Sequence, residues 1–378
     1  MDLIKSALTT SKQTAQAVSD ITAQLHRDPA LVLFFASTAY QFEEITAALH
    51  SQYPKAQVVG VTTTGEIGPD GFSTQSLSAQ SYSTAFGKVG AFLMQDIEKY
   101  PIFDRPQLIE AASAIGIQTT ARDIDKQGLA YVFPVGLKSG EEKMLSVINS
   151  IFTYDGFPIF GGTAGDDAKF EVTKVSVNGE ISTTGGATVF MKPHVDFYIY
   201  KENIFESTGH HVKITKADAE KRIVYEMNNR PATQVYAELI GTTVSNLSSE
   251  LSFHPLGRKF NDDYLIASPF EALADGSVSF YCQVYEGAMF EILKPKNAVV
   301  EMKHTRAAFE QLFKNIEGVL ACNCILRKLQ FENERIFPAL NEEMNQLPNL
   351  CGFSSYGEQL NKSQLNQTLL MIGFGTLR

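Results

Sequence analysis

The sequence contains no tryptophan, only four cysteines and no long apolar run. None of its apolar stretches approaches the roughly 18 residues that a membrane-spanning helix needs. The first residues, MDLIKSALTTSKQ, lack the basic start and apolar block of a secretory signal. We therefore expect a cytoplasmic protein that does not act at a membrane, and its 378 residues are enough for two or three domains.

Basic residues are in deficit, with 32 Lys and Arg against 42 Asp and Glu and a net charge of −10. Proteins that bind nucleic acid present clustered Lys and Arg to the phosphates, and no basic run occurs in this chain. The same acidic balance disfavours anionic membranes. The composition predicts neither a nucleic-acid nor a membrane partner.

The four cysteines are Cys282, Cys322, Cys324 and Cys351. In a cytosolic protein we expect them to be reduced. Cys322 and Cys324 lie in GVLACNCILR, a predicted strand, so their side chains point to the same face. Two thiolates could contribute to a soft-metal site, but no second Cys pair completes a set of four ligands. Buried free thiols are the favoured interpretation.

Sequence motifs of common enzymes are also missing. The chain has no G-x-S-x-G and no H-E-x-x-H, and it lacks the phosphate-binding patterns G-x-G-x-x-G and G-x4-G-K-[ST]. Asp166 and Asp167 are adjacent acids, but neighbouring residues of an extended turn point apart. The sequence therefore predicts a protein that is not an enzyme.

One glycine phrase occurs three times. VVGVTTTGEIG begins at Val58, IFGGTAGDDA at Ile159 and NLCGFSSYGEQL at Asn349, and each contains two glycines separated by three or four residues, the latter followed directly by an acid (G-x3/4-G-[DE]). Each phrase closes a longer unit that consists of a buried apolar strand, an amphipathic helical stretch and a second short strand. The three units begin with ALVLFFAS, LAYVFPVG and VLACNCIL and have closely similar lengths. The chain is predicted to be built on repeated β-α-β units.

Alternating polar and apolar residues between these units indicate antiparallel strands, with Asn178-Gly179 as a hairpin turn. The predicted fold class is α/β, a mixed α+β architecture of repeated β-α-β units with large mixed, partly antiparallel sheets. The polar stretch over residues 205–220 is the best candidate for a domain boundary. We predict two domains, 1–215 and 216–378.

The glycine phrases are also the candidate site. Glycine permits a sharp turn at a strand end, and ligands of α/β proteins bind at the carboxyl ends of strands. A following carboxylate can accept a ligand's amine or hydroxyl, or it can cap its own loop without touching a ligand, and both interpretations stay open. The predicted ligand-binding residues are Gly60, Glu66, Gly162, Asp166, Tyr356 and Glu358.

These segments resemble the FIST sensory proteins, in which an N-terminal and a C-terminal FIST domain occur side by side. VVGVTTTGEI, FPVGLKSGEEKML, PIFGGTAGDDAKF and VSVNGE carry the N-terminal resemblance. VKITKADAEKRIVYEMNNRPATQVYAELIG, CNCILRKL, GFSSYGEQ and LNQT carry the C-terminal one, and together they cover roughly residues 29–375. The resemblance implies a sensory protein for small, amino-acid-like ligands.

One branch of the family is similar to haem-containing nitric-oxide sensors, which act on a separate histidine kinase or cyclic-di-GMP enzyme. The resemblance implies haem b here, and an axial iron ligand must come from His, Cys, Met or Tyr. His254, in the apolar setting LSFHPLGRKF, ranks first, and the adjacent His210 and His211 follow. The leading prediction is a haem-based nitric-oxide sensor, and the alternative is a sensor of an amino-acid-like metabolite without haem.

Overall fold

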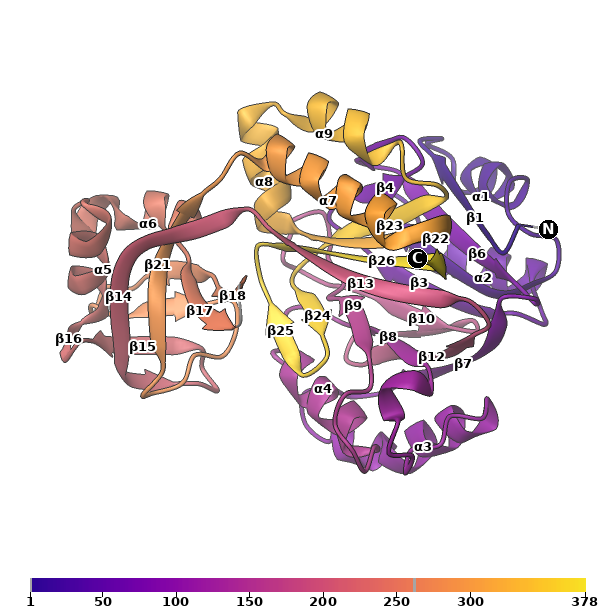
Figure 1. The fold of residues 1–378 in the computed structure, drawn as a ribbon, viewed down its shortest axis with the longest axis horizontal. Coiled ribbons are helices and arrows are strands. Elements are labelled where there is room, and N and C mark those ends of the chain that lie inside the picture. The colour runs from indigo at the N-terminus through magenta and orange to yellow at the C-terminus, as the bar shows by residue number, and fades with distance from the viewer. Residues whose placement is uncertain (1, 261–262) are drawn as a thin grey trace. The chain divides into compact units, whose positions relative to one another are not determined.

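The computed structural model describes residues 2–260 and 263–378, and the chain forms two compact units (Figure 1). Unit 1 holds Met1–Lys201, Met302–Gln364 and Leu369–Arg378. Unit 2 holds Glu202–Glu301 and Leu365–Thr368. The predicted domain boundary, after residue 215, falls within strand β14 (Phe205–Asp218) of unit 2. The division of the chain into domains 1–215 and 216–378 stays a prediction.

Unit 1 contains the three predicted β-α-β units, which confirms the mixed α/β fold class. Each has two parallel, neighbouring strands. The first strand is buried almost throughout in the first two units, and in the third its apolar part, residues 318–324, is buried, as the continuous apolar sequences predict. The connecting helices are α2 (Phe42–Gln52) in the first unit and α4 (Glu141–Ser150) in the second, and the third has both α8 (Ile325–Glu334) and α9 (Phe337–Met344). Helix α2 buries Phe42, Ile45 and Leu49, which recur on one face at helical spacing.

Three six-stranded sheets form around these parallel pairs. Sheet 1 runs in the order β1 (Ile4–Thr9), β6 (Leu77–Ser83), β2 (Pro29–Ala36), β3 (Gln57–Thr62), β10 (Val175–Val177) and β11 (Glu180–Ser182). Sheet 2 runs in the order β7 (Gly87–Met94), β12 (Gly186–Pro193), β8 (Leu129–Pro134), β9 (Ile159–Gly162), β24 (Glu358–Leu360) and β25 (Ser363–Leu365). Sheet 3 runs in the order β13 (Asp196–Asn203), β26 (Thr368–Leu377), β22 (Phe313–Cys324), β23 (Leu350–Ser355), β4 (Glu66–Gly68) and β5 (Gly71–Ser73).

The hairpin at the end of each sheet does not follow the β-α-β unit that forms the middle of that sheet. It follows one of the other two units. Hairpin β4–β5 follows the first unit but pairs with β23 of sheet 3, and hairpin β24–β25 follows the third unit but pairs with β9 of sheet 2. Hairpin β10–β11 follows the second unit and pairs with β3 of sheet 1. The three glycine phrases are therefore the places where the chain leaves one sheet for the next, and we call them the first, second and third crossover turns.

The three sheets share one core. Phe35 of sheet 1, Phe133 of sheet 2 and Phe353 of sheet 3 are fully buried, and their ring centroids lie between 4.7 and 6.0 Å apart. Burial of each ring contributes roughly 2–3 kcal/mol to folding. The remaining helices of unit 1 lie outside the sheets, and α1 packs against α2 while α3 packs against α4. These helices are α1 (Thr14–Thr22), α3 (Arg105–Ala114), η1 (Pro101–Asp104) and η2 (Ile124–Lys126).

Unit 2 is built on one antiparallel sheet in the order β18-β17-β21-β14-β15-β20-β19, with β16 beside β15. Its buried core includes Val212, Ile214, Tyr236 and Ile292. The strands are β14, β15 (Ile223–Met227), β16 (Arg230–Pro231), β17 (Leu256–Phe260), β18 (Asp263–Ala267), β19 (Pro269–Ala272), β20 (Val278–Phe280) and β21 (Met289–Pro295). The helices are α5 (Ala232–Ile240), η3 (Val244–Asn246), α6 (Leu247–Glu250) and η4 (Leu251–Phe253), and α7 (Ala298–Leu312) leads back into unit 1.

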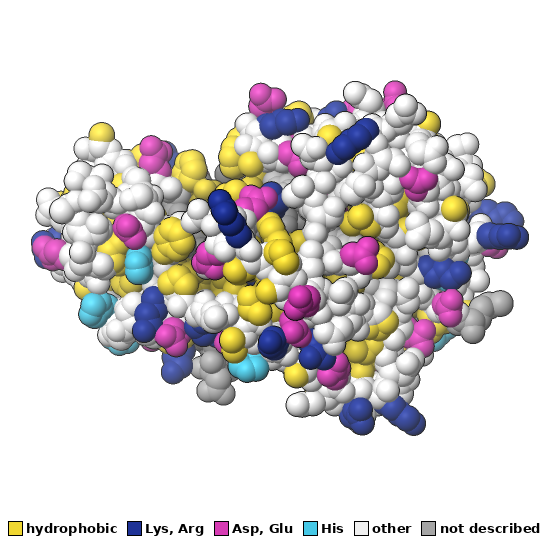
Figure 2. All heavy atoms as spheres, turned by 90° about the horizontal axis from the view of Figure 1, so that it is seen from above, with side chains coloured by type: hydrophobic (Ala, Val, Ile, Leu, Met, Phe, Trp, Pro, Cys, Tyr) yellow, Lys and Arg dark blue, Asp and Glu magenta, His cyan; other side chains and the backbone are white. Residues whose placement is uncertain are grey.

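Two surface observations complete the description. Among the described residues, no helix combines the length and the apolar character needed to cross a membrane. Figure 2 shows Lys and Arg side chains interspersed with Asp and Glu side chains over the face that it draws. That face carries no continuous basic patch, which agrees with the charge pattern of the sequence.

Candidate functional site

The three crossover turns meet and bond to one another through their backbones. Each pair of turns is joined by two hydrogen bonds, so the turns form a closed triangle whose polar backbone groups satisfy each other. The N–H to C=O bonds run from Thr64 to Ser354 (3.0 Å), Ser354 to Gly65 (2.7 Å), Gly165 to Thr62 (2.8 Å), Asp167 to Thr63 (2.8 Å), Thr163 to Gly357 (2.8 Å) and Tyr356 to Thr163 (3.1 Å).

The glycine directly before the acid of each phrase makes this close approach possible. Gly65 and Gly357 have φ values of +135° and +150°, which side chains other than glycine's rarely adopt. Gly165 is needed for space instead, because a Cβ there would lie 2.4 Å from Thr64 Cγ2. The repeated phrase thus reflects a repeated mechanical requirement.

Two of the three acids cap their own turns. Glu66 is fully buried, and it accepts hydrogen bonds from the Thr63 hydroxyl and from the Ser76 N–H (2.9 Å) and hydroxyl (2.6 Å). In the third turn the Ser355 hydroxyl donates to Oε1 of the buried Glu358 at 2.8 Å. Both arrangements join a hydroxyl to an acid three residues later, as a self-capping turn requires.

Burial raises the pKa of Glu66 to about 7, and the nearby negative charge of Asp167 adds to the shift. The hydrogen bonds from Ser76 and Thr63 act in the opposite direction and lower that pKa. The carboxyl group of Glu66 is therefore poised to change its charge near neutral pH.

The second turn departs from this arrangement. Asp166 accepts hydrogen bonds from the Tyr356 hydroxyl and the Phe170 N–H (3.0 Å) at Oδ1. Its Oδ2 accepts the N–H groups of Glu171 (2.7 Å) and Val172 (3.0 Å). Asp166 thus fastens the segment 166–173 to the third turn, whereas the bonds described for Glu66 and Glu358 come from buried residues.

The next residue secures the same segment on its other side. Asp167 Oδ2 accepts the Ser37 hydroxyl (2.8 Å) and both the N–H and the hydroxyl of Thr38 (2.7 Å each). Thr173 Oγ1 accepts the Gly136 N–H at 2.8 Å, which ties the segment to the loop after β8. Asp166 and Asp167 point to different partners, as expected for adjacent residues of an extended turn.

An apolar surface lies over Asp166. Phe170 is 53% exposed and stacks on Tyr356, with ring centroids 5.1 Å apart and an interplanar angle of 9°. Leu137 and Val172, on the two joined loops, are also exposed. Burial raises the pKa of Tyr356, and the hydrogen bond and charge of Asp166 raise it further. The phenol therefore stays protonated and donates to the carboxylate.

The loop after β8 and the segment 166–173 contain several residues with strained backbone conformations. Five residues that are not glycine have positive φ, and each such residue costs on the order of 1–3 kcal/mol unless the surrounding structure compensates. They are Leu137 (+68°), Ser139 (+50°), Asp167 (+55°), Ala168 (+62°) and Phe170 (+57°). Strain of this kind concentrates at ligand clamps and switches.

Two of the predicted ligand-binding residues, Gly60 and Gly162, lie in the strands that precede the turns and pack against core rings. A Cβ at Gly60 of β3 would lie 2.0 Å from the Phe34 ring, and one at Gly162 of β9 would lie 2.9 Å from the Phe353 ring. Both glycines make room for core aromatic rings. Glu66, Asp166, Tyr356 and Glu358 are the predicted residues that the crossover turns bring together.

The predicted haem residues all lie in unit 2. His254 has a side chain that is 25% exposed, with Nδ1 3.3 Å from the Leu293 carbonyl and Nε2 4.0 Å from the Glu250 carboxylate. His210 Nδ1 lies 2.8 Å from the Leu239 carbonyl, and His211 is paired with Glu291 of β21. Among the described residues, no three His, Cys, Asp or Glu side chains gather as metal ligands.

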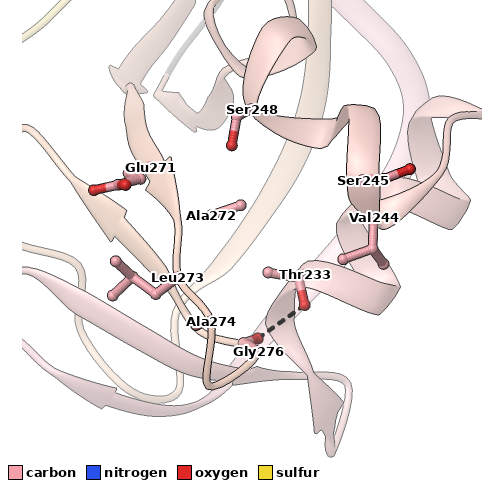
Figure 3. A pocket seen from close by; sticks show the side chains of 9 residues that line it. All are labelled: Thr233, Val244, Ser245, Ser248, Glu271, Ala272, Leu273, Ala274 and Gly276. Carbon is pink, nitrogen blue, oxygen red and sulfur yellow. Dashed lines mark hydrogen bonds between the residues drawn. The ribbon is translucent and has the colours of Figure 1, made fainter.

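Unit 2 also holds a pocket of about 640 Å³ that the sequence patterns did not indicate. Figure 3 shows that it lies between β19 with its following turn and the helical segments α5, η3 and α6. The Thr233 hydroxyl donates to the Gly276 carbonyl at 3.1 Å, and the Ser248 side chain points into the pocket. The lining residues are small or polar: Thr233, Val244, Ser245, Ser248, Glu271, Ala272, Leu273, Ala274 and Gly276.

The residues that sequence reasoning missed are those on the rim. Phe170, Leu137 and Val172 lie in loops whose conformation depends on distant partners, such as the Ser37 hydroxyl that donates to Asp167. One signal was available in the sequence: a hydroxyl residue precedes each acid by three positions, at Thr63, Thr163 and Ser355. This spacing is typical of a self-capping turn.

Similar proteins were found by sequence and by structure. An uncharacterized protein of Methanocaldococcus jannaschii, MJ1623, is 26% identical over 272 residues, which cover 64% of this chain and 52% of that protein. The match therefore spans about half the length of this relative. A cyanuric acid hydrolase from A. caulinodans aligns over the whole of both chains at 8% identity with a TM-score of 0.37, which is too low to carry an argument.

Family models match both parts of the chain. The FIST N domain matches residues 30–230, and the FIST C domain matches residues 232–361. The first of these matches alone covers more than half of the chain. FIST domains are small-ligand sensors in signal transduction. The chain therefore belongs to the FIST family, with a FIST N domain followed by a FIST C domain.

Proposed function

We propose that this chain is a cytoplasmic sensor that binds a small molecule at the second crossover turn, in a binding rather than a catalytic role. One observation carries the proposal. In the second turn Asp166 accepts the hydroxyl of Tyr356 from the third turn and the N–H groups of an exposed, strained segment that carries Phe170. The hydrogen bonds described for the acids of the other two turns come from buried residues, namely Thr63, Ser76 and Ser355.

The chemistry of this turn suits an amino-acid-like metabolite. A ligand ammonium group can compete with the Tyr356 hydroxyl at Asp166, because an ammonium adds the attraction of a full positive charge to its hydrogen bond with the carboxylate, and a neutral phenol does not. The exposed rim of Phe170, Leu137 and Val172 offers contact to an apolar side chain. Loss of the Tyr356 bond would favour a second arrangement of the segment 166–173, and a sensor needs two such states.

A ligand screen tests this proposal. We expect one class of amino acid or small amine to raise the melting temperature of the wild-type chain, because binding to the native state adds stability. The shift should disappear in Asp166→Asn and persist in Asp155→Asn, whose carboxyl group is 86% exposed. A shift that Asp166→Asn retains in full, or no shift with any compound of the panel, contradicts the proposal.

We propose haem b at His254 as a second candidate, with nitric oxide as the signal. The observation that favours it is the position of Nδ1, 3.3 Å from the Leu293 carbonyl. A bond of this kind fixes the tautomer of a ligating imidazole and leaves Nε2 for iron. His210 has a similar bond to Leu239, at an exposed position. Haem, when bound, would supply the iron that coordinates the gas.

Absorption spectroscopy separates the two candidates. If His254 binds haem, incubation with haemin should give a sharp Soret band at one haem per chain, and reduction followed by nitric oxide under anaerobic conditions should shift the band. His254→Ala should abolish the band, while the matched variant His194→Ala should keep it. A broad band typical of loosely associated haem, or an unchanged spectrum in His254→Ala, contradicts this ligand assignment.

We further propose that a separate histidine kinase or cyclic-di-GMP enzyme reads the ligand-bound state. The support is thermodynamic, since a partner can respond only if it binds the two states of the sensor with different affinity. The test is the autophosphorylation rate, or the cyclic-di-GMP turnover, of candidate enzymes from the same genome with and without the chain. The rate should change when the chain is present and change again with ligand. An identical rate in all conditions contradicts that pairing.

A further inference from the structure

The turn that leads into α3 exposes an unusual amount of apolar surface. Tyr100 is 63% exposed, Ile102 53% and Phe103 72%, and the two rings lie 5.8 Å apart. Among the described residues, no large apolar side chains are more exposed than those of Tyr100 and Phe103. Clustered exposed aromatic side chains are typical of protein interaction sites. We call these three residues the aromatic turn.

A pocket of about 480 Å³ begins beside the aromatic turn, at Asp104. It lies along β7 and the hairpin β10–β11, and β7 and β11 are the edge strands of sheets 2 and 1. Asp104 and Glu180 supply two carboxylates, and no Lys or Arg lines the pocket. The other lining residues are Ala91, Phe92, Leu93, Gln95, Gln107, Val177 and Asn178.

The electrostatics of this pocket favour a cation. Burial raises the pKa of Asp104 and the negative charge of Asp96 adds to that shift, while the backbone hydrogen bond from Gln95 opposes it. Two nearby basic side chains are engaged elsewhere. The Arg105 guanidinium donates to the Ser150 carbonyl at 2.9 Å, and Lys143 Nζ donates to the Glu98 carbonyl at 2.9 Å. An incoming cation would offset the cost of keeping Asp104 ionised.

We propose that the aromatic turn and this pocket form one docking surface for a segment of a partner protein. A Lys or Arg side chain of that segment enters between Asp104 and Glu180, and an adjacent apolar side chain covers Tyr100 and Phe103. Such a combination of a basic and an apolar anchor is characteristic of interface hot spots. A second copy of this chain is a poor occupant, because a two-fold contact would have to supply the cation from the same face, where Arg105 and Lys143 are already bonded to carbonyl groups.

Peptide selection tests the surface directly. A phage-displayed library of random 12-residue peptides is selected on the wild-type chain and counter-selected on Phe103→Ser. We expect enriched peptides to combine a Lys or Arg with a large apolar residue. Failure to enrich any peptide, or enrichment of acidic peptides, overturns the proposal.

Binding measurements on a selected peptide then assign the two anchors. Phe103→Ser and Asp104→Asn should each weaken binding at least roughly tenfold, equivalent to about 1.4 kcal/mol. Phe270→Ser, which removes a ring that is 54% exposed in unit 2, should leave binding within about twofold of wild type. Unchanged melting temperatures establish that the variants fold.

Charge reversal provides an independent check. A peptide whose basic residue is replaced by Glu should regain affinity for Glu180→Lys, because the new pair restores the attraction. Equal binding of both peptides to both proteins overturns the assignment of the pocket. If sedimentation shows that the wild-type chain dimerises and that Phe103→Ser is monomeric, the occupant is a second copy, and the proposed partner segment is wrong.

Discussion

At the scale of single residues, the carboxyl groups of the crossover turns have different roles despite a shared phrase. Glu66 and Glu358 accept hydrogen bonds from hydroxyl groups of their own turns, whereas Asp166 holds a neighbouring turn and a surface segment. The sequence indicated three equivalent acids and left open whether each caps a loop or meets a ligand. Partners such as Tyr356, far away in the chain, decide between these roles, and local spacing carries no information about them.

Glu66 predicts a defined pH dependence of stability. Its pKa is raised in the folded state to about 7 from an ordinary value of 4.5, so its contribution is fully present below pH 4.5 and is lost as pH rises through 7. Glu66→Gln removes this titration. Between pH 4.5 and 8, the free energy of unfolding of the variant should therefore rise by about 3 kcal/mol relative to that of the wild type. Urea unfolding across this pH range measures the difference.

The glutamine also changes the bonds to Ser76, which adds an offset that does not depend on pH. The prediction is therefore tested only by how the difference in unfolding free energy between the variant and the wild type changes with pH. Glu220→Gln, at an exposed site, should follow the wild-type curve at every pH. A pH-independent difference between Glu66→Gln and wild type would mean that Glu66 titrates in its ordinary range.

At the scale of elements, the β-α-β units were predictable and the hairpin exchange was not. Apolar strands and amphipathic helices leave a periodic pattern in the sequence, and β2, β8 and β22 formed where that pattern predicted them. Hairpin β4–β5 carries no local mark of its partner, because its pairing with β23 depends on packing between distant segments. Helix α8 was missed because GVLACNCILR was predicted to be one strand, whereas β22 ends at Cys324 and α8 begins at Ile325.

The close pairing of β22 and β23 predicts a strict requirement for glycine. A Cβ at Gly352 would lie 1.9 Å from the Ala321 carbonyl oxygen, so Gly352→Ala must push the two strands apart. We expect a loss of about 3 kcal/mol or more in the free energy of unfolding. Gly241→Ala is the matched control, since Gly241 has φ +72° at the end of α5 and nothing lies within 4 Å of its added Cβ.

The control should cost only about 1 kcal/mol, the usual penalty for a left-handed conformation without a clash. Urea denaturation followed by circular dichroism measures both variants. Equal losses in Gly352→Ala and Gly241→Ala would show that the strands accommodate a methyl group and that the contact is not decisive.

At the scale of the whole molecule, the chain builds two compact units, and unit 2 is formed mainly by Glu202–Glu301, between segments of unit 1. Because each unit has its own core, we expect a destabilising substitution in one unit to leave the stability of the other unchanged. Ile292 of β21 is fully buried in unit 2, and Ile292→Ala should cost about 3 kcal/mol. Hydrogen exchange should then accelerate in β14, β15 and β21 and stay unchanged in β8.

The reciprocal variant Ile45→Ala removes a buried side chain from α2 of unit 1 and should accelerate exchange in unit 1 alone. Mass spectrometry of peptides from both units gives the measurement in one experiment. Parallel loss of protection in both units, in either variant, would mean that the chain unfolds as one cooperative whole.

Because hairpin β4–β5 pairs with a strand far later in the sequence, it has to wait for its partner while the chain is synthesised on the ribosome. Hairpin β4–β5 is made early, but its partner β23 is translated only near residues 350–355, a delay on the order of tens of seconds at ordinary elongation rates. Sheet 3 cannot be completed before then, and the waiting hairpin presents a free edge that another nascent chain could pair with. Slow translation of the last hundred residues should therefore favour entangled dimers, and early capture by a chaperone should suppress them.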